Sequence, residues 1–312
     1  MSRKKILVIG SASMDLSMNM YKIPERGETI IDDGGVAYTP GGKGANAAVA
    51  ISKLGADAVL CAKLGADLHG QKLYNFYKDM GIDTSSVKVD RERPTGLAVV
   101  MKEGDGENRI VVYPGANSHI GADAIEEAFE CSPDAVYLGF EIPFETALAA
   151  ARIASERNIP IFVDAAPASR EHELEALPEI EVFTPNESEI LEYTGIAPTT
   201  MESCLRASLA LYRRVKCKYI VIKLGSRGAF IYDGKRYSQS PAFRAGATVD
   251  TTAAGDAFGA ALVIEYLYNG GDIKSATKYA CAAGAIAVSR YGASSAMPTA
   301  DEVDYLISNA LM

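Results

Sequence analysis

From about residue 134 onward, the sequence alternates short apolar segments with longer segments of helical spacing. "AVYLG", "PIFVDAA" and "YIVIKLG" have the length and apolar content of buried strands, whereas "PFETALAAARIASERN", between the first two, is typical of a helix. A helix between consecutive strands makes them parallel and covers the faces of their sheet. The alternation therefore predicts an α/β fold of three αβα layers, Rossmann-like, with a mostly parallel central sheet and helices on both faces.

A β-rich patch breaks this alternation in the N-terminal half. "TGLAVVMKEGDGENRIVVYPGAN" is typical of two strands joined by a Gly-Asp-Gly turn, and "ETIIDDGGVAYT" is a further β-rich stretch. These segments predict a small separate sheet built from about 13–40 and 94–114. We expect the rest of residues 1–312 to form a single α/β domain, since this length suits one large domain.

Charge and composition exclude several classes of protein. The net charge is −9 and the longest basic run is Arg3-Lys4-Lys5, so a nucleic-acid-binding face is not expected. No stretch approaches ~18 uncharged apolar residues, so no transmembrane helix or membrane partner is expected. Five cysteines without a Cys-x-x-Cys pair, together with only three histidines, favour reduced thiols in the cytoplasm over a zinc site.

Six polar motifs stand where predicted strands end. They are "GSASMD", "PGGKGAN", "GFE" at Gly139–Glu141, "PNESE" at Pro185–Glu189, "KLGSRG" at Lys223–Gly228, and "DTTAAGDAFGAAL" from Asp250. Ligands of doubly wound sheets bind beyond the carboxyl ends of the strands, so these motifs predict one site at one edge of the sheet. None of them has the spacing of a P-loop or of a G-x-G-x-x-G dinucleotide motif.

The last of these motifs predicts an anion site with an acid beside it. If a helix begins near Ala254, the backbone N–H groups of residues 253–256 lack intrahelical partners and favour a bound anion. An Asp in the first turn of a helix is usually a simple complement to the helix dipole. Beside a phosphoryl group, however, Asp256 can accept the proton of an attacking hydroxyl, which is the role that we predict for it.

Taken together, "PGGKGAN", "TPNESE", "KLGSRG" and "DTTAAGDAFGAAL" resemble the ribokinase family of carbohydrate kinases, of phosphofructokinase-B type, in their order over nearly the whole chain. Within that family, "GGKGAN" is most similar to the ribokinases. The resemblance implies ATP-dependent phosphorylation of the primary 5-hydroxyl of D-ribose, with Mg²⁺ and K⁺ as cofactors. It further implies that the small sheet is a lid over the sugar and joins two copies of the chain into a homodimer.

The resemblance also implies roles for individual residues. Catalysis is implied for Asp256 as the base, with Ala253, Ala254 and Gly255 as the anion hole. Sugar contacts are implied for Ser13, Asp15, Gly41, Gly42, Lys43, Asn46, Glu141 and Asp256. Nucleotide contacts are implied for Asn186, Lys223, Gly225, Ser226, Gly228 and Gly255. Magnesium is implied at Glu189 through water, and a monovalent cation at Asp250, Thr252, Ala287, Arg290 and Gly292.

Two departures from the family pattern leave alternatives open. Ser13 stands where ribokinases commonly carry Asn, so 2-deoxyribose, a nucleoside or another furanose sugar is an alternative acceptor. Ala296 stands where a serine often completes the cation site. The predicted lid offers Tyr38 and Tyr113 but no Trp or Phe, which favours a bare sugar over a nucleobase. A sugar-binding regulator without catalysis is a further alternative, which the intact acidic motifs disfavour.

Overall fold

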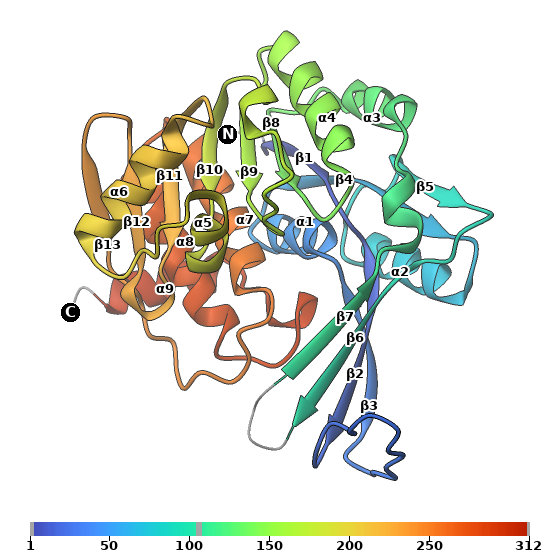
Figure 1. Ribbon diagram of the computed structural model, residues 1–312. Coiled ribbons are helices and arrows are strands. Elements are labelled where there is room, and N and C mark those ends of the chain that lie inside the picture. The colour runs from blue at the N-terminus through green and yellow to red at the C-terminus, as the bar shows by residue number, and fades with distance from the viewer. Residues whose placement is uncertain (1–2, 104–107, 311–312) are drawn as a thin grey trace.

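A nine-stranded sheet forms the centre of the molecule, in a computed structural model that describes residues 3–103 and 108–310. Its strand order is β13-β12-β11-β10-β9-β8-β1-β4-β5 (Figure 1). The strands are β1 (Lys5–Ile9), β4 (Asp57–Gly65), β5 (Val87–Asp90), β8 (Ala135–Gly139), β9 (Ile161–Asp164), β10 (Ile180–Thr184), β11 (Cys217–Lys223), β12 (Ala229–Tyr232) and β13 (Tyr237–Ser240). Neighbouring strands are parallel from β5 to β11, whereas β12 pairs antiparallel with both β11 and β13.

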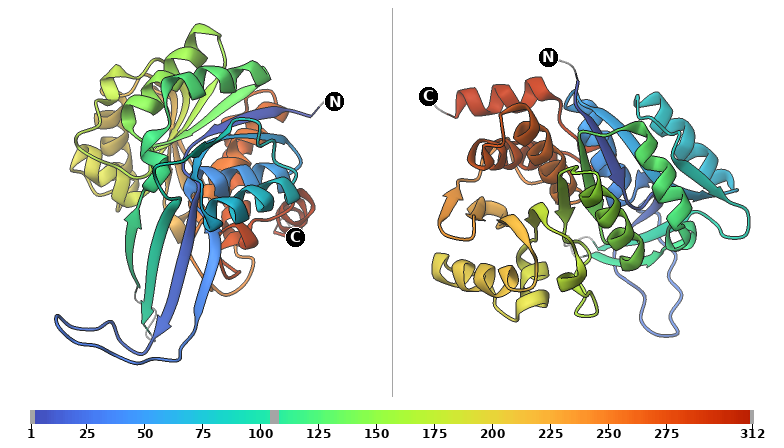
Figure 2. Two further views of the ribbon diagram at one scale, coloured as in Figure 1. Left: turned by 90° about the vertical axis from the view of Figure 1, so that its right-hand side faces the viewer. Right: turned by 90° about the horizontal axis from the view of Figure 1, so that it is seen from above.

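Helices cover both faces of this sheet (Figures 1 and 2). Alternate residues of β1 enter opposite cores: Ile6 and Val8 enter one, and Leu7 and Ile9 enter the other. The first core is covered by α1 (Lys43–Lys53), α2 (Leu68–Asp79), α7 (Ala254–Tyr268), α8 (Ile273–Ala287) and α9 (Ala300–Asn309). The second is covered by α3 (Ala122–Ala128), α4 (Phe144–Glu156), α5 (Glu187–Thr194) and α6 (Met201–Tyr212). The predicted three-layer fold class is confirmed.

The length and the hydropathy of a helix decide whether it could cross a membrane. Among residues 3–103 and 108–310, no helix combines the length and the apolar character that crossing a bilayer requires.

A second sheet of four strands projects from the body (Figures 1 and 2). This small sheet has the order β3-β2-β6-β7 and consists of β2 (Ser13–Met20), β3 (Val36–Gly41), β6 (Gly96–Glu103) and β7 (Asn108–Tyr113). The pairs β2–β3 and β6–β7 are antiparallel, and β2 and β6 are parallel. The Gly-Asp-Gly turn that we predict between β6 and β7 lies outside the described residues.

One part of the predicted β-rich patch is wrong. In "ETIIDDGGVAYT", residues 28–35 form no strand, and β3 begins only at Val36. The carboxylate of Asp32 accepts hydrogen bonds from the backbone N–H groups of Tyr21 and Gly34, both at 2.7 Å. This local turn competes with strand pairing for the backbone. Gly35 follows with a φ of 104°, which places it in the region that favours glycine.

Two close backbone approaches bring the helices that carry the site to the middle of the sheet. Strand β1 lies between β4 and β8, so the strand order reverses there, which is where doubly wound sheets bind ligands. A Cβ atom on Gly44 would lie 2.7 Å from the backbone of Gly10, so this glycine pair lets the start of α1 lie against the end of β1. Likewise, Gly259 of α7 packs directly on Tyr137 of β8.

A glycine substitution tests the packing of α7 on β8. A Cβ atom on Gly259 would lie 2.0 Å from the hydroxyl of Tyr137, and Ala257 and Ala260 around it are fully buried. We expect Gly259→Ala to lower the free energy of unfolding by about 1–3 kcal/mol, as overpacked cores do. The matched control is Gly284→Ala in α8, where the nearest atom to the new Cβ is 3.6 Å away.

Urea unfolding of the two variants measures the difference. Gly284→Ala should be neutral or stabilising by up to about 1 kcal/mol, because alanine is the better helix former. Equal stability of the two variants would contradict the proposed close contact between α7 and β8.

Candidate active site

A pocket of about 180 Å³, lined by many polar residues, lies between the central sheet and the small sheet, beyond the end of β1. Seven of the eight predicted sugar contacts line it: Ser13, Asp15, Gly42, Lys43, Asn46, Glu141 and Asp256. The eighth, Gly41, packs directly against Asp15: a Cβ atom on Gly41 would be 2.1 Å from the Asp15 carboxylate. Residues from β2, α1, the end of β8 and α7 thus meet in one pocket.

Glu141 fixes the turn that opens α1. Its Oε2 atom accepts a hydrogen bond from the backbone N–H of Lys43 at 3.0 Å and one from the hydroxyl of Ser11. Gly42 has a φ of 89°, and a Cβ atom there would lie 2.8 Å from Ala12. Only glycine fits this turn, which brings the start of α1 against the residues that follow β1.

Asp256 is buried, and two consecutive hydrogen bonds connect it to side chains from two other segments of the sequence. The amide Nδ2 of Asn46 donates to Oδ2 of Asp256 at 2.9 Å. The hydroxyl of Ser294 in turn donates to Oδ1 of Asn46 at 2.8 Å. Asp256 is 3% exposed and Ser294 is 4% exposed, so both bonds are shielded from water. This chain fixes the direction in which the Asp256 carboxylate points.

Burial and neighbouring charges set the protonation of the pocket. Burial raises the pKa of Asp256 to about 6; Lys43 opposes this shift and Asp164 adds to it. Burial, followed by repulsion from Glu141, raises the pKa of Asp15 to about 6. The pKa of Lys43 is raised, with Asp256 as the largest contribution, so its ammonium is the local counterion of the acids.

The start of α7 presents free backbone donors beside Asp256. Helix α7 begins at Ala254, and among residues 3–103 and 108–310 the N–H groups of Gly255 and Asp256 have no acceptor. The N–H of Ala254 makes only a long contact, 3.4 Å, with the carbonyl of Thr251. Ala253 precedes the helix with a φ of 59°, an uncommon conformation for a residue with a side chain. This tight turn leaves the helix N-terminus suited to an anion.

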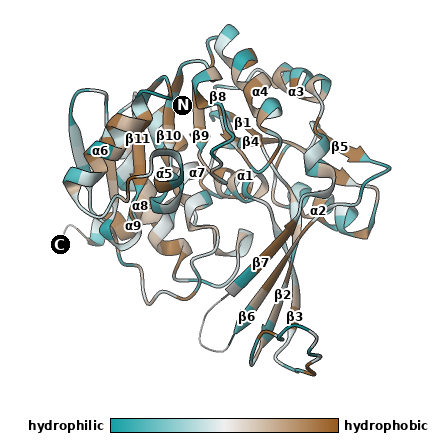
Figure 3. Ribbon diagram, viewed as in Figure 1, coloured by the Kyte–Doolittle hydropathy of each residue, from teal (hydrophilic) through white to brown (hydrophobic). Residues whose placement is uncertain are grey.

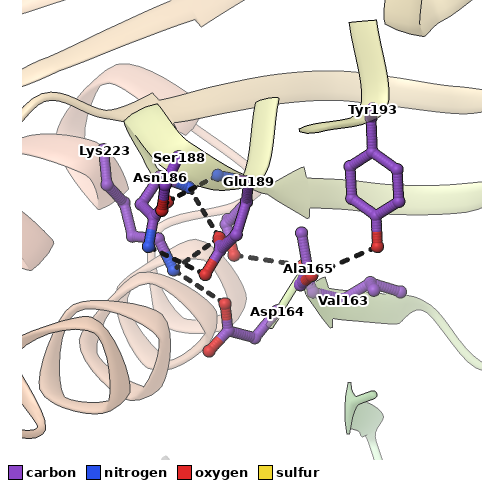
Figure 4. A network of polar contacts seen from close by, with 9 residues as sticks. Val163, Asp164, Ala165, Asn186, Ser188, Glu189, Tyr193 and Lys223 are labelled. Atoms are coloured by element: carbon purple, nitrogen blue, oxygen red, sulfur yellow. Dashed lines mark hydrogen bonds and ion pairs between the residues drawn. The ribbon is translucent and has the colours of Figure 1, made fainter. Parts of the chain in front are cut away.

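Lys223, whose side chain is mostly buried, points toward Asp164 and Glu189 (Figure 4). The amino group of Lys223, at the end of β11, is 2.7 Å from Oδ1 of Asp164 and 4.0 Å from Oε2 of Glu189. A Cβ atom on Gly255 would lie 3.5 Å from that amino group. The pKa of Lys223 is raised because the two carboxylates outweigh the opposing effect of burial. A permanent positive charge therefore lies next to the start of α7.

The N-x-x-E motif has a structural role of its own. The side chain of Asn186 accepts from the N–H of Glu189 at 2.8 Å, and the carboxylate of Glu189 accepts from the N–H of Asn186 at 2.7 Å. This reciprocal capping box begins α5. Burial raises the pKa of Glu189, with Lys223 opposing.

The other predicted nucleotide residues follow β11 in sequence. Gly225 and Ser226 are exposed there, and Gly228, with a φ of 81°, lies against the carbonyl of Ser240. Gly225, Ser226 and Gly228 do not line the pocket between the two sheets.

The predicted monovalent-cation residues are only partly brought together. Asp250, Thr252 and Gly292 meet: Asp250 accepts from the N–H of Thr252 at 2.9 Å and from that of Gly292 at 3.4 Å. Arg290 could offer a cation only its backbone carbonyl, since its guanidinium is itself positively charged and pairs with Glu302 of α9 at 2.6 Å. The carbonyl of Ala287 accepts from the N–H of Arg290 at 3.2 Å.

The side chains at the site that were not predicted from the sequence include Asp164, Ser294 and Lys102. Asp164 ends the predicted strand "PIFVDAA", and a carboxylate at a strand end is a signal that could have found it. Ser294 has no such signal, because it lies 248 residues from Asn46 in the chain. Lys102 belongs to the small sheet and pairs with Asp250 at 3.3 Å.

Sequence comparison identifies the family of this arrangement. The pattern described as pfkB family carbohydrate kinase matches residues 3–300. The chain is 36% identical to the ribokinase of Bacillus subtilis, a match that covers 98% of this chain and 100% of that protein. The chain belongs to the pfkB family of carbohydrate kinases.

Two further similar proteins extend the comparison. A bifunctional ribokinase/ribose-5-phosphate isomerase A of Fructilactobacillus sanfranciscensis is 32% identical over 99% of this chain, which spans 57% of that longer protein. The structure of Arabidopsis thaliana ribokinase complexed with ribose and ATP superposes with a TM-score of 0.86 at 30% identity, covering 98% of this chain and 99% of that one. The resemblance seen in the motifs is therefore confirmed, and the chain is an ATP-dependent carbohydrate kinase.

In this pfkB-family kinase, the raised pKa of Asp256 predicts a cost in stability. Its folded pKa of about 6 lies above the ordinary 3.8, so the ionised side chain destabilises the folded state. This cost is absent below about pH 4 and complete above about pH 6. We expect Asp256→Asn to raise the free energy of unfolding by about 1–3 kcal/mol at pH 7.5 and to leave it nearly unchanged at pH 4.

Urea unfolding at the two pH values measures this difference. The control is Asp123→Asn, which changes an exposed acid in the first turn of α3 and should have little effect on stability. An Asp256→Asn variant that is less stable than the wild type at pH 7.5 would contradict the assigned direction of the pKa shift.

Proposed function

We propose that this kinase transfers the γ-phosphoryl group of ATP to the primary 5-hydroxyl of D-ribose and releases ribose 5-phosphate and ADP. The observation that carries the proposal is the position of Asp256: a buried carboxylate, aimed by Asn46, beside the free N–H donors of α7. The likeness to two whole-length ribokinases, one of them with ribose and ATP, supports ribose as the acceptor.

Asp256 acts as the general base. With a pKa of about 6, its carboxylate is mostly ionised at pH 7 and is more basic than an exposed aspartate. The 5-hydroxyl gives its proton to Asp256 while its oxygen forms a bond to the γ-phosphorus. The bond from that phosphorus to the bridging oxygen breaks, and ADP takes the electron pair.

The start of α7 stabilises the charge on the phosphoryl group during transfer. The N–H groups of Gly255 and Asp256 donate to its oxygens, and the helix dipole adds to their effect. Lys223 supplies a full positive charge beside Gly255. These groups are already in place before the substrate arrives, so little reorganisation is needed.

The residues near Lys223 fit a magnesium ion shared with the nucleotide. Among the described residues, no three acidic, His or Cys side chains form a cluster that could hold a metal ion alone. Mg²⁺ commonly takes one or two carboxylates, several waters and substrate phosphates, and Glu189 with Asn186 offers oxygen ligands for that arrangement. Bound there, the ion would neutralise phosphate charge. The family resemblance also implies a monovalent cation at Asp250, where the structure instead has an ion pair.

The pocket suits a polyol better than a nucleoside. Asp15 and Glu141 offer acceptors for several hydroxyl groups, and Tyr113 is the one aromatic side chain among its described lining residues. The ring of Tyr38 already stacks on His69 at 5.5 Å, so it is engaged elsewhere. Ser13 donates to Asp15 at 3.3 Å and is shorter than asparagine, which keeps 2-deoxyribose as the second candidate.

We propose that the small sheet is a lid over the sugar and the interface of a homodimer. Its face opposite the pocket carries Val36, Tyr38 and Val111, which are 60%, 56% and 61% exposed. Figure 3 shows apolar residues along β7 of this projecting sheet. A second lid packed on this face would bury them. The five cysteines are all free, which supports the cytoplasm as the compartment.

Asp256→Asn tests the general base. We expect kcat to fall roughly 10²–10⁴-fold because the base is lost, with the Kd for ATP nearly unchanged. Coupled ADP release measures the first and titration calorimetry the second. The control, Asp123→Asn at the exposed start of α3, should retain full activity. Near-normal turnover by Asp256→Asn would remove Asp256 from the role of base.

A panel of acceptors tests the substrate. We expect kcat/KM to be highest for D-ribose among ribose, 2-deoxyribose, fructose and several nucleosides, because Asp15 and Glu141 pair with hydroxyls that the deoxy sugar partly lacks. ADP release with each acceptor measures the order. A higher value for 2-deoxyribose or for a nucleoside would overturn ribose and leave the kinase assignment intact.

A further inference from the structure

Strand β6 carries one charged residue toward the pocket. Ala98, Val100 and Lys102 alternate along this strand, and all three line the pocket. The amino group of Lys102 is 3.3 Å from Oδ2 of Asp250, which lies 148 residues further along the chain. The small sheet is therefore joined by an ion pair to the segment that leads into α7.

Asp250 organises that segment with both of its oxygens. Oδ1 accepts from the N–H of Thr252 at 2.9 Å and from its hydroxyl at 2.6 Å. Oδ2 accepts from Lys102 and from the N–H of Gly292 at 3.4 Å. The Asp250 side chain is 10% exposed and that of Lys102 is 31% exposed, so the pair is partly shielded from water.

These contacts do not fit a resident monovalent cation next to Asp250. Each carboxylate oxygen of Asp250 already accepts two hydrogen bonds, and a second positive charge beside Asp250 would repel the ammonium of Lys102. The carboxylate thus already has a counterion that belongs to the chain.

We propose that Lys102 is a positioning residue whose ammonium takes the place of the monovalent cation at Asp250. Since Lys102 belongs to the small sheet, closing this sheet over the sugar also orders residues 250–253, which precede the phosphoryl-binding start of α7. The ion pair therefore couples the closure of the small sheet over the substrate to the ordering of the turn before the phosphoryl-binding start of α7. This inference rests on the proposed function.

Replacement of Lys102 by an uncharged residue of similar length tests the proposal. We expect wild-type kcat to differ by less than about twofold between KCl and choline chloride of equal ionic strength. In choline, Lys102→Met should lose about tenfold in kcat with a smaller change in the KM for ATP, because the phosphoryl-binding turn is misplaced. KCl should restore most of this loss, and Lys102→Arg should behave as the wild type.

Lys63→Met is the matched control. Lys63 makes an ion pair with Asp90 at 3.4 Å. The side chains of this pair are 23% and 10% exposed, which is close to the values for Lys102 and Asp250. This pair lies outside the sugar pocket, so the variant should show neither the loss in choline nor the response to KCl.

Hydrogen exchange supplies a readout that does not depend on turnover. Amides of residues 250–256 should exchange faster in Lys102→Met than in the wild type, and KCl should slow this exchange only in the variant. A wild type that needs potassium for turnover, or a Lys102→Met variant with wild-type kcat and exchange in choline, would overturn the proposal. A wild type without sugar kinase activity would refute the proposed function, whereas the exchange data would still decide whether Lys102 orders the turn.

Discussion

The active site depends on a carboxylate that the fold buries, although an ionised group is more stable in water. Asp256 is 3% exposed, and burial raises its pKa to about 6. An ionised group in such a place persists only when charges and hydrogen bonds compensate for lost hydration. Lys43 supplies the charge and Asn46 the hydrogen bond, and both lie on α1. Helices α1 and α7, more than 200 residues apart in sequence, must therefore meet at one point for the site to exist.

Small residues make this meeting possible. Gly44 lets α1 approach the end of β1, and Gly259 lets α7 lie on Tyr137 of β8. The buried alanines of both helices allow the same close approach along their length. Since α7 is apolar on nearly all sides, α1, α8 and the sheet cover its middle, and its N-terminus faces the pocket. Packing thus explains why the free donors of α7 occur at the pocket.

Local patterns predicted the strands, the helices and the residues at strand ends, because these depend on periodicity and on turn chemistry. The motif around Gly42 and the start of α7 at Ala254 could be placed from sequence for this reason. The side-chain contacts between segments far apart in the sequence could not be predicted in this way. Ser294 reaches Asn46, and Lys223 reaches Asp164, only through the tertiary fold, and no spacing in the sequence encodes such distances. The irregular stretch at 28–35 was missed because Asp32 closes a turn that strand patterns do not register.

Asp250 illustrates how a motif can be retained while its chemistry changes. Asp250 keeps the place that the family pattern gives it, but Lys102 from another sheet is its counterion. A bound ion exchanges freely with solvent, whereas an ammonium on β6 arrives and leaves with the sheet that carries it. If the Lys102 ammonium replaces the cation, the charge that stabilises Asp250 moves with the small sheet. The turn before α7 is then ordered when the small sheet covers the pocket.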